Sequence, residues 1–212
     1  LPFVNMSGDQ ANEFFSDGIS EEILNVLAGV PELQVAARTS SFSFKGKNLE
    51  VPEIAKALNV RMALEGSVRQ QGDTVRITAQ LINAESGFHL WSQTYDRQLQ
   101  DIFAIQDEIA KAIGDELKVK VGIDDKSAGS AGATTDVAAY ELYLHGMSLW
   151  HARREQGMLQ AIDLFKQALA IDPDYAPAYA GLALTFTILP AYSATVTWEE
   201  GISLSRDYAV HA

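Results

Sequence analysis

Apolar positions in the first 123 residues recur with two different periods, one typical of helices and one typical of strands. A helical period runs through Asp9–Gly29, where Phe, Ile and Leu residues form one stripe. Two further helices are expected at Val51–Leu58 and at Asp101–Lys118, which repeats isoleucine every three or four residues. Two short apolar runs, Leu1–Val4 and Leu33–Ala37, predict strands.

Three longer strands are expected in succession after residue 60. Arg61–Gln70 and Asp73–Asn83 alternate apolar and polar residues, and Gln71-Gly72 between them is a two-residue hairpin signal. A turn at these two residues would place Val68 opposite Val75 and give the hairpin one apolar face.

The third strand follows a second turn, expected around Glu85-Ser86, which would place Leu81 opposite Leu90. The opposite face of the sheet would then carry mostly polar side chains from all three strands: Glu65, Ser67, Arg69, Arg76, Thr78, Gln80, Trp91, Gln93 and Tyr95. Together these patterns predict an α+β domain, a mixed five-stranded sheet with packed helices, over residues 1–123.

A flexible linker is predicted at 124–136, where Gly, Ser, Ala and Thr replace the apolar period. Residues 137–212 are expected to be all-helical. Ala161, Phe165, Ala168 and Pro173 have the spacing of the second helix of a 34-residue tetratricopeptide repeat, and Gly146 stands at the close-contact position of the preceding helix. We therefore expect a tetratricopeptide-repeat solenoid fragment with one complete repeat and a truncated second one.

Composition narrows the function classes. The chain has 212 residues, 47% apolar and 21% charged, which is typical of a globular protein. Its net charge of −12 has the wrong sign for binding nucleic acid or an anionic membrane surface. It has no Cys, and no apolar run is long enough for a membrane span. The opening without Met or leader, and the end within a predicted helix, indicate a fragment of a longer protein.

Neither a metal site nor a catalytic residue is predicted. His145 and His151 are six residues apart, so they cannot form a helical metal-binding pair. Glu65-Gly66-Ser67 lies in the middle of a strand instead of at a nucleophile elbow. We expect no catalytic residue, no metal and no cofactor.

Two candidate ligand sites are predicted in the first domain. A hydroxyl-rich loop with basic residues could hold an anion, and it contains Arg38, Thr39, Ser40, Lys45 and Lys47. The alternative is a turn whose hydroxyls bond to the backbone. The second candidate is the polar sheet face with Glu65, Ser67, Arg76, Trp91 and Tyr95, for which the alternative is a face with paired charges, covered by a helix or by the repeats.

A third candidate site is the concave face of the repeats. Alignment on Gly146 directs aromatic and apolar side chains toward it, and such residues are enriched in binding surfaces. The expected partner-binding residues are Tyr140, Tyr143, Met147, Trp150, Ala180, Leu184 and Thr187. The alternative is that this surface packs against the first domain or the next repeat.

Several motifs give the chain a family resemblance. They are Leu1-Pro2-Phe3-Val4-Asn5, Asp17-Gly18-Ile19, Arg38-Thr39-Ser40-Ser41, Leu64-Glu65-Gly66-Ser67-Val68-Arg69 and Leu90-Trp91-Ser92. The whole resembles a TolB-like amino-terminal domain, related to FlgO-type envelope proteins, followed by tetratricopeptide repeats. In bacteria this pair typically forms the C-terminal part of CadC-like regulators or of class III adenylate or guanylate cyclases. The resemblance implies a sensory or scaffold segment and supplies no catalytic residue.

From the residues and the resemblance we expect a non-enzymatic interaction and sensory module of a larger bacterial signalling protein. It would bind a protein or peptide partner through the repeats and regulate an upstream effector domain. The alternatives are the regulatory segment of a cyclase whose catalytic domain is absent here, and an envelope scaffold. We expect a periplasmic segment of an inner-membrane protein, with a cytoplasmic location as the alternative. Self-association into a homo-oligomer is expected from the unpaired terminal repeat.

Overall fold

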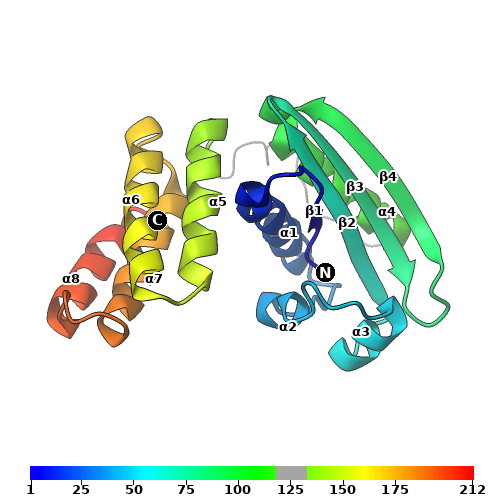
Figure 1. Cartoon of the computed structure of the whole chain (residues 1–212), viewed down its shortest axis with the longest axis horizontal. Helices are drawn as coiled ribbons and strands as arrows, with labels where there is room; N and C mark the ends of the chain where they lie inside the picture. Colours follow the sequence, from blue (N-terminus) through cyan, green and yellow to red (C-terminus); the bar gives the residue numbers. More distant parts are fainter. Residues whose placement is uncertain (118–132) are drawn as a thin grey trace. The chain divides into compact units, whose positions relative to one another are not determined.

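The computed structural model describes residues 1–117 and 133–212, which belong to two compact units, Leu1–Asp125 and Lys126–Ala212 (Figure 1). Most of the linker predicted at 124–136 lies outside the described residues, as does Lys118, the predicted end of the last helix of the first domain. Each unit is therefore described by itself.

The first unit combines four strands with four α-helices in its described residues. In chain order these elements are β1 Val4–Asn5, α1 Glu13–Ala28, α2 Arg38–Phe42, α3 Val51–Leu58, β2 Met62–Gln71, β3 Thr74–Asn83, β4 His89–Gln98 and α4 Ile102–Leu117. The prediction of a helix at Val51–Leu58 is confirmed, with Pro52 in its first turn. Short 3₁₀ turns at Gln10–Asn12 and Leu99–Asp101 lead into α1 and α4.

The sheet has four strands in the order β1-β2-β3-β4, so the prediction of a five-stranded sheet is wrong. β1 runs parallel to β2, and the other neighbours are antiparallel. The missing strand is Leu33–Ala37, which forms no strand in the described residues. Its side chains explain the difference, because Gln34 and Val35 are exposed and the short apolar run has no sheet face to cover.

The hairpin of β2 and β3 turns one residue later than predicted. Gly72 and Asp73 form the turn, and Gly72 has a φ of +57°, a value that favours glycine. Val68 therefore pairs with Ile77 and not with Val75. A shift of two residues in the pairing leaves every side chain on its predicted face, so the apolar face of this hairpin is as expected.

The pairing of β4 differs more from the prediction, because a β-bulge interrupts it. Leu81 pairs with Trp91 and Ile82 with His89, so Leu90 is the extra residue. Beyond the bulge Tyr95 pairs with Ile77 and lies on the apolar face, where it is only 1% exposed. A one-residue shift moves every side chain of a strand to the other face, so Trp91 and Tyr95 were predicted on the wrong face.

The core of the first unit lies between the apolar face of the sheet and two helices, α1 and α4 (Figure 1). The helices contribute a row of fully buried apolar side chains, namely Phe15, Ile19 and Ile23 from α1 and Ile102, Ile105, Ile109 and Ile113 from α4. At the edge of the sheet Phe3 packs over Gly66, where an added Cβ would meet the ring at 3.0 Å and the carbonyl oxygen of Thr78. α3 packs on β2 near one end of the sheet.

The second unit consists of four α-helices and a short 3₁₀ turn in its described residues. The helices are α5 Val137–His151, α6 Glu155–Ile171, α7 Ala176–Ile188 and α8 Trp198–Ala209, and the turn is Leu189–Ala191. They form two helix pairs, α5 with α6 and α7 with α8, joined by packing of α6 on α7 (Figure 1). The prediction of a solenoid fragment is corrected accordingly: these helices surround a single core, and a solenoid is not evident in them.

Phe165 of α6 is at the centre of that core. A Cβ added at Gly146 of α5 would come within 2.6 Å of the Phe165 ring, and one added at Gly181 of α7 would come within 2.7 Å. The two glycines therefore let α5 and α7 approach the same aromatic ring. The predicted close-contact position of Gly146 is confirmed.

Candidate functional site

A cleft of about 580 Å³ is present in the first unit. Its walls come from α1, α2, α3, β2, the end of α4 and the extended segment at residues 32–36. The aliphatic side chains that line it include Ile23, Leu24, Leu27, Leu33, Val35, Ile54, Leu58, Met62, Leu64 and Leu117. Its volume is within the range of small-molecule sites, about 300–1,000 Å³.

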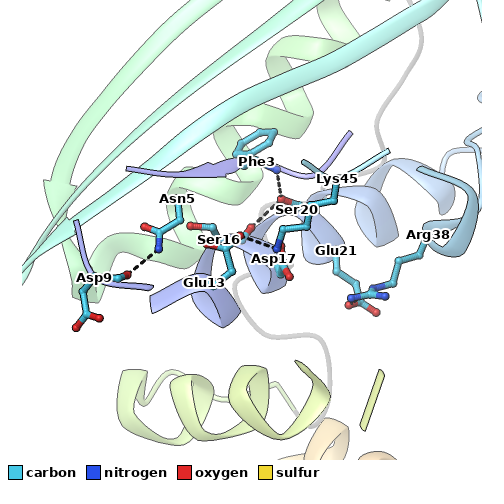
Figure 2. Close-up of polar contacts among 10 residues, drawn as sticks. All are labelled: Phe3, Asn5, Asp9, Glu13, Ser16, Asp17, Ser20, Glu21, Arg38 and Lys45. Atoms are coloured by element: carbon cyan, nitrogen blue, oxygen red, sulfur yellow. Dashed lines mark hydrogen bonds and ion pairs between the residues drawn. The ribbon is translucent and has the colours of Figure 1, made fainter. Parts of the chain in front are cut away.

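Two hydroxyl groups in the cleft wall bond to the backbone, whereas the exposed side chains of Gln34 and Asn59 also line the cleft. The Ser20 hydroxyl accepts a hydrogen bond from the Phe3 N–H at 2.8 Å and donates to the Ser16 carbonyl at 2.7 Å (Figure 2). The Ser41 hydroxyl donates to the Arg38 carbonyl at 3.1 Å. Charged residues line the cleft at Glu32 and Arg61, both exposed and of opposite sign. The cleft therefore combines aliphatic side chains with polar and charged groups at exposed positions.

The predicted anion loop is helical over Arg38–Phe42, which forms α2, and it places Arg38 and Lys45 against acidic side chains of α1. Arg38 Nε lies 2.6 Å from Glu21 Oε2 (Figure 2). The guanidinium also covers the ring of Phe42 at 4.0 Å. Lys45 Nζ lies 2.6 Å from Glu13 Oε1 and 2.5 Å from Asp17 Oδ1. Because these carboxylates already neutralise both cations, a bound anion would have to compete with them.

The other residues of that loop have smaller roles. Thr39 and Ser40 are exposed, and the Ser40 carbonyl accepts a hydrogen bond from the Ser43 hydroxyl. Lys47 Nζ lies 5.2 Å from the centre of the Phe44 ring. The acidic partners were missed, although Glu13, Asp17 and Glu21 repeat every four residues and this spacing predicts one helix face.

Burial raises the pKa values of two carboxyl groups of α1. It raises the pKa of Glu22 to about 7, and the neighbouring charge of Glu21 adds to the rise. Burial also raises the pKa of Asp17, although the hydrogen bond and charge of Lys45 act in the opposite direction. For Lys45 itself, burial acts to lower the pKa, but its hydrogen bonds and charge interactions with Asp17 and Glu13 raise it above its usual value.

The predicted polar sheet-face site is not assembled as expected. Glu65, Ser67 and Arg76 share the polar face, whereas Trp91 and Tyr95 lie on the other one. Arg76 binds Asp96 across the strands, in an ion pair whose two side chains are each 54% exposed. Two further cross-strand hydrogen bonds continue this row, Thr78 with Thr94 and Gln80 with Ser92.

Several side chains predicted for the repeat groove pack into the core of the second unit. Trp150 is 9% exposed, and Tyr143 and Met147 pack against the core cluster. The guanidinium of Arg153 covers the Trp150 ring at 3.8 Å. Tyr143 lies edge-on to Tyr175, with 5.4 Å between ring centres. These aromatic residues therefore stabilise the helix pairs.

The remaining residues of that predicted site differ in exposure. Tyr140 is buried and Ala180 is half-buried, whereas Leu184 is 46% exposed. The Thr187 hydroxyl donates to the Ala183 carbonyl and bonds to the Ser205 hydroxyl of α8 at 2.7 Å. Partner binding at this face stays a prediction.

Within residues 1–117 and 133–212, no group of three or more His, Asp or Glu side chains is placed to hold a metal ion. In the same residues, no helix is long and apolar enough to cross a membrane. The cleft itself was missed by sequence reasoning, because its residues come from many separate segments between Leu1 and Leu117 and no single motif marks it.

Comparison with known proteins shows that the chain is similar to part of a longer bacterial protein. No family model matches the chain. The chain is 39% identical over 184 residues to a protein of Rhizobium meliloti (strain 1021) named "Putative adenylate cyclase 3". The match covers 87% of this chain but only 31% of the Rhizobium protein. The chain is thus similar to about a third of a protein named as a nucleotide cyclase.

Proposed function

We propose that this chain is a non-catalytic interaction and sensory segment that regulates the cyclase activity of an adenylate cyclase-like protein. The observation that carries the proposal is the similarity to a part of the Rhizobium protein, over 87% of this chain. A catalytic domain would then belong to the remaining length of such a protein. Two of the basic residues expected to bind a ligand, Arg38 and Lys45, are already paired with carboxylates, which supports a structural role for them.

The proposal also assigns a domain type to each part of the chain. The chain would combine a TolB-like domain at 1–123 with tetratricopeptide-type helix pairs at 137–212, joined by a linker at 124–136. The supporting observations are the Leu64–Arg69 motif in β2 and the two glycines that flank Phe165. The helix pairs would bind a protein or peptide, and the segment would be periplasmic in an inner-membrane protein.

Two experiments test this function. The purified chain is incubated with ATP or GTP and with Mg²⁺ or Mn²⁺, and we expect no cyclic nucleotide, whereas turnover would overturn the proposal. In the second, the matched segment of the Rhizobium protein is deleted or replaced by this chain. We expect the deletion to change the rate of cyclic AMP formation and this chain to restore it, and an unrelated domain of equal length to fail.

A deletion that leaves the cyclase rate unchanged would contradict regulation and favour the scaffold alternative. The compartment is tested separately, by protease treatment of intact and osmotically opened cells that make the full-length protein. A periplasmic segment is cleaved once the outer membrane alone is opened. Cleavage only after lysis would place it in the cytoplasm.

A further inference from the structure

α8 carries an exposed apolar stripe along one side. Trp198 is 57% exposed and Ile202 is 54% exposed, and Ala209 is exposed as well. These three residues recur at spacings of four and seven, which places them on one line of an α-helix. We call them the α8 stripe. Two large apolar side chains in it are therefore in contact with water.

The side of α8 that packs within the unit is a different one. α8 packs on α7 and on the turn Leu189–Ala191 (Figure 1). Tyr208 stacks on Phe186 of α7, with 5.7 Å between ring centres, and the Ser205 hydroxyl bonds to Thr187. Helical periodicity places Gly201, the one buried residue of α8, on this packed side. The α8 stripe lies beside it.

Two charges of opposite sign flank the stripe. Glu199 and Arg206 are seven residues apart, so they lie on the same side of α8, and both are exposed. Within residues 1–117 and 133–212, no ion pair includes either of them. Glu200 differs, because its carboxylate accepts the Thr197 N–H in the capping box. The stripe therefore has a free negative charge near one end and a free positive charge near the other.

This order of charges is complementary to itself when two copies of α8 run in opposite directions. A two-fold axis near Ile202 would place Glu199 of each copy opposite Arg206 of the other, on both sides of the axis. The two Ile202 side chains would meet at the centre, and the large Trp198 would lie near the small Ala209 of the other copy. A parallel arrangement would instead bring Glu199 against Glu199.

We propose that two copies of this chain associate through the α8 stripe, with the two α8 helices antiparallel. This locates the self-association that the sequence predicts. The capping box fixes the first turn of α8 before association, which lowers the cost of ordering it. Each chain carries a net charge of −12, so two copies repel unless opposite charges meet locally. The interface goes beyond the proposed function, and each can fail without the other.

Sedimentation velocity of the full chain at several concentrations measures the association. Because one pair of helices is smaller than a standard interface of about 1,600 Å², we expect a reversible dimer with a micromolar dissociation constant. Ile202→Glu should weaken it at least about tenfold, because it puts two like charges at the centre. Ser203→Glu is the matched control, since the neighbouring Ser203 is exposed outside the stripe and should leave dimerisation unchanged.

Charge reversal tests the antiparallel geometry. Glu199→Arg and Arg206→Glu should each weaken the dimer at least about tenfold, and the double variant should restore it. Asp207→Arg makes the same change of charge as Glu199→Arg on the far side of the helix, and it should not weaken the dimer. A general effect of net charge would strengthen association in Glu199→Arg, because that variant is less negative. Circular dichroism verifies that these exposed positions tolerate the substitutions.

Three results would overturn the proposal. The first is a chain that stays monomeric at about 100 µM, well above the dissociation constant expected for such an interface. The second is equal dimerisation of the Ile202→Glu and Ser203→Glu variants, which would place the interface elsewhere on the chain. The third is a double charge reversal that dimerises no better than the single ones, which would exclude the pairing of Glu199 with Arg206.

Discussion

The ring of Phe165 lies against Gly146 so closely that a methyl group on the glycine would come within 2.6 Å of it. Gly181 approaches the same ring from α7, at 2.7 Å by the same measure. The fully buried Phe165 therefore fills the space that side chains at both glycines would occupy. Close approach of three helices around one ring depends on these two positions.

Gly146→Ala should destabilise the second unit by about 1–2 kcal/mol. Overpacking of a core costs about 1–3 kcal/mol, and the better helix propensity of alanine offsets up to about 1 kcal/mol of that. Urea denaturation followed by circular dichroism measures the change in unfolding free energy. Gly29→Ala is the matched control, because its φ is −73° and the nearest atom would be at an ordinary 3.4 Å.

A double variant tests whether contact with the Phe165 ring causes the loss of stability in Gly146→Ala. Phe165→Leu shortens the side chain facing Gly146, so Gly146→Ala should cost less in that background than in the wild type. Equal costs in both backgrounds would contradict the interpretation. A Gly146→Ala variant as stable as the wild type would do so as well.

Glu21→Gln should destabilise the first unit by about 1 kcal/mol. The substitution removes the charge that Arg38 binds at 2.6 Å, and both side chains are less than one-fifth exposed. The wild type should also lose more stability in high salt than the variant does, because salt screens the ion pair. Thermal melting at low and high NaCl measures both effects.

Glu32→Gln supplies the control for charge alone, because Glu32 is exposed and lies on the same unit. We expect this variant to melt within error of the wild type. An equal loss of stability in Glu21→Gln and Glu32→Gln would indicate a general effect of removing a negative charge and not the pairing of Glu21 with Arg38.

Glu22 should make the first unit less stable as the pH rises. Burial raises its pKa to about 7 in the folded chain, against an ordinary value of 4.5. The folded state therefore holds a proton that the unfolded state releases, and this contribution to stability is complete below pH 4.5 and lost as the pH rises through about 7. Urea denaturation between pH 4 and 8 measures the slope.

Glu22→Gln cannot ionise, so its stability should fall less over this pH range, and the gap in its favour at pH 8 should be about 1–3 kcal/mol. Comparison with the wild type at each pH separates this effect from that of Asp17 and Asp107, whose pKa values burial also raises. Parallel pH profiles would contradict the assignment to Glu22.

Tyr95→Ala should destabilise the first unit by about 3–5 kcal/mol, the range for removal of a large buried aromatic side chain. Tyr95 is 1% exposed and pairs with Ile77 on the apolar face. Thr94→Ala is the matched control, because the neighbouring Thr94 is exposed on the polar face and should change the unfolding free energy by less than about 0.5 kcal/mol. Equal effects would contradict the pairing of β4.

The different outcomes for the sheet show what periodicity can predict. The faces of β2 and β3 follow from alternation alone, so an error of one residue in the turn left Val68 in the core. The face of Tyr95 depends on one extra residue, Leu90, in the bulge of β4. A bulge changes the alternation locally, and the residues 89–91 carry no marker of it in the sequence.

Long-range pairing explains the other differences. Arg38 and Lys45 were expected to bind an anion because a linear sequence shows basic residues and hydroxyls together. In the folded chain they meet carboxylates 17 to 32 residues earlier in the sequence, on one face of α1. Likewise, the apolar run at Leu33–Ala37 predicts a strand, whereas the fold uses Leu33 and Val35 as one wall of a cleft.

The Ser20 hydroxyl connects Phe3, the residue before β1, to α1. The hydroxyl is buried, accepts the Phe3 N–H at 2.8 Å and donates to the Ser16 carbonyl at 2.7 Å (Figure 2). Phe3 is itself 1% exposed and packs over Gly66. The backbone of this residue therefore enters the core only because a side chain satisfies its N–H.

Ser20→Ala should destabilise the first unit by about 1–3 kcal/mol, because it leaves the Phe3 N–H buried without a hydrogen-bond partner. Ser43→Ala is the matched control: its hydroxyl also donates to a backbone carbonyl, that of Ser40, but at an exposed position where water replaces the bond. Urea denaturation measures both variants, and hydrogen exchange of the Phe3 amide locates the effect. Unchanged protection of that amide in the Ser20→Ala variant would show that another group, and not the Ser20 hydroxyl, holds the first strand against α1.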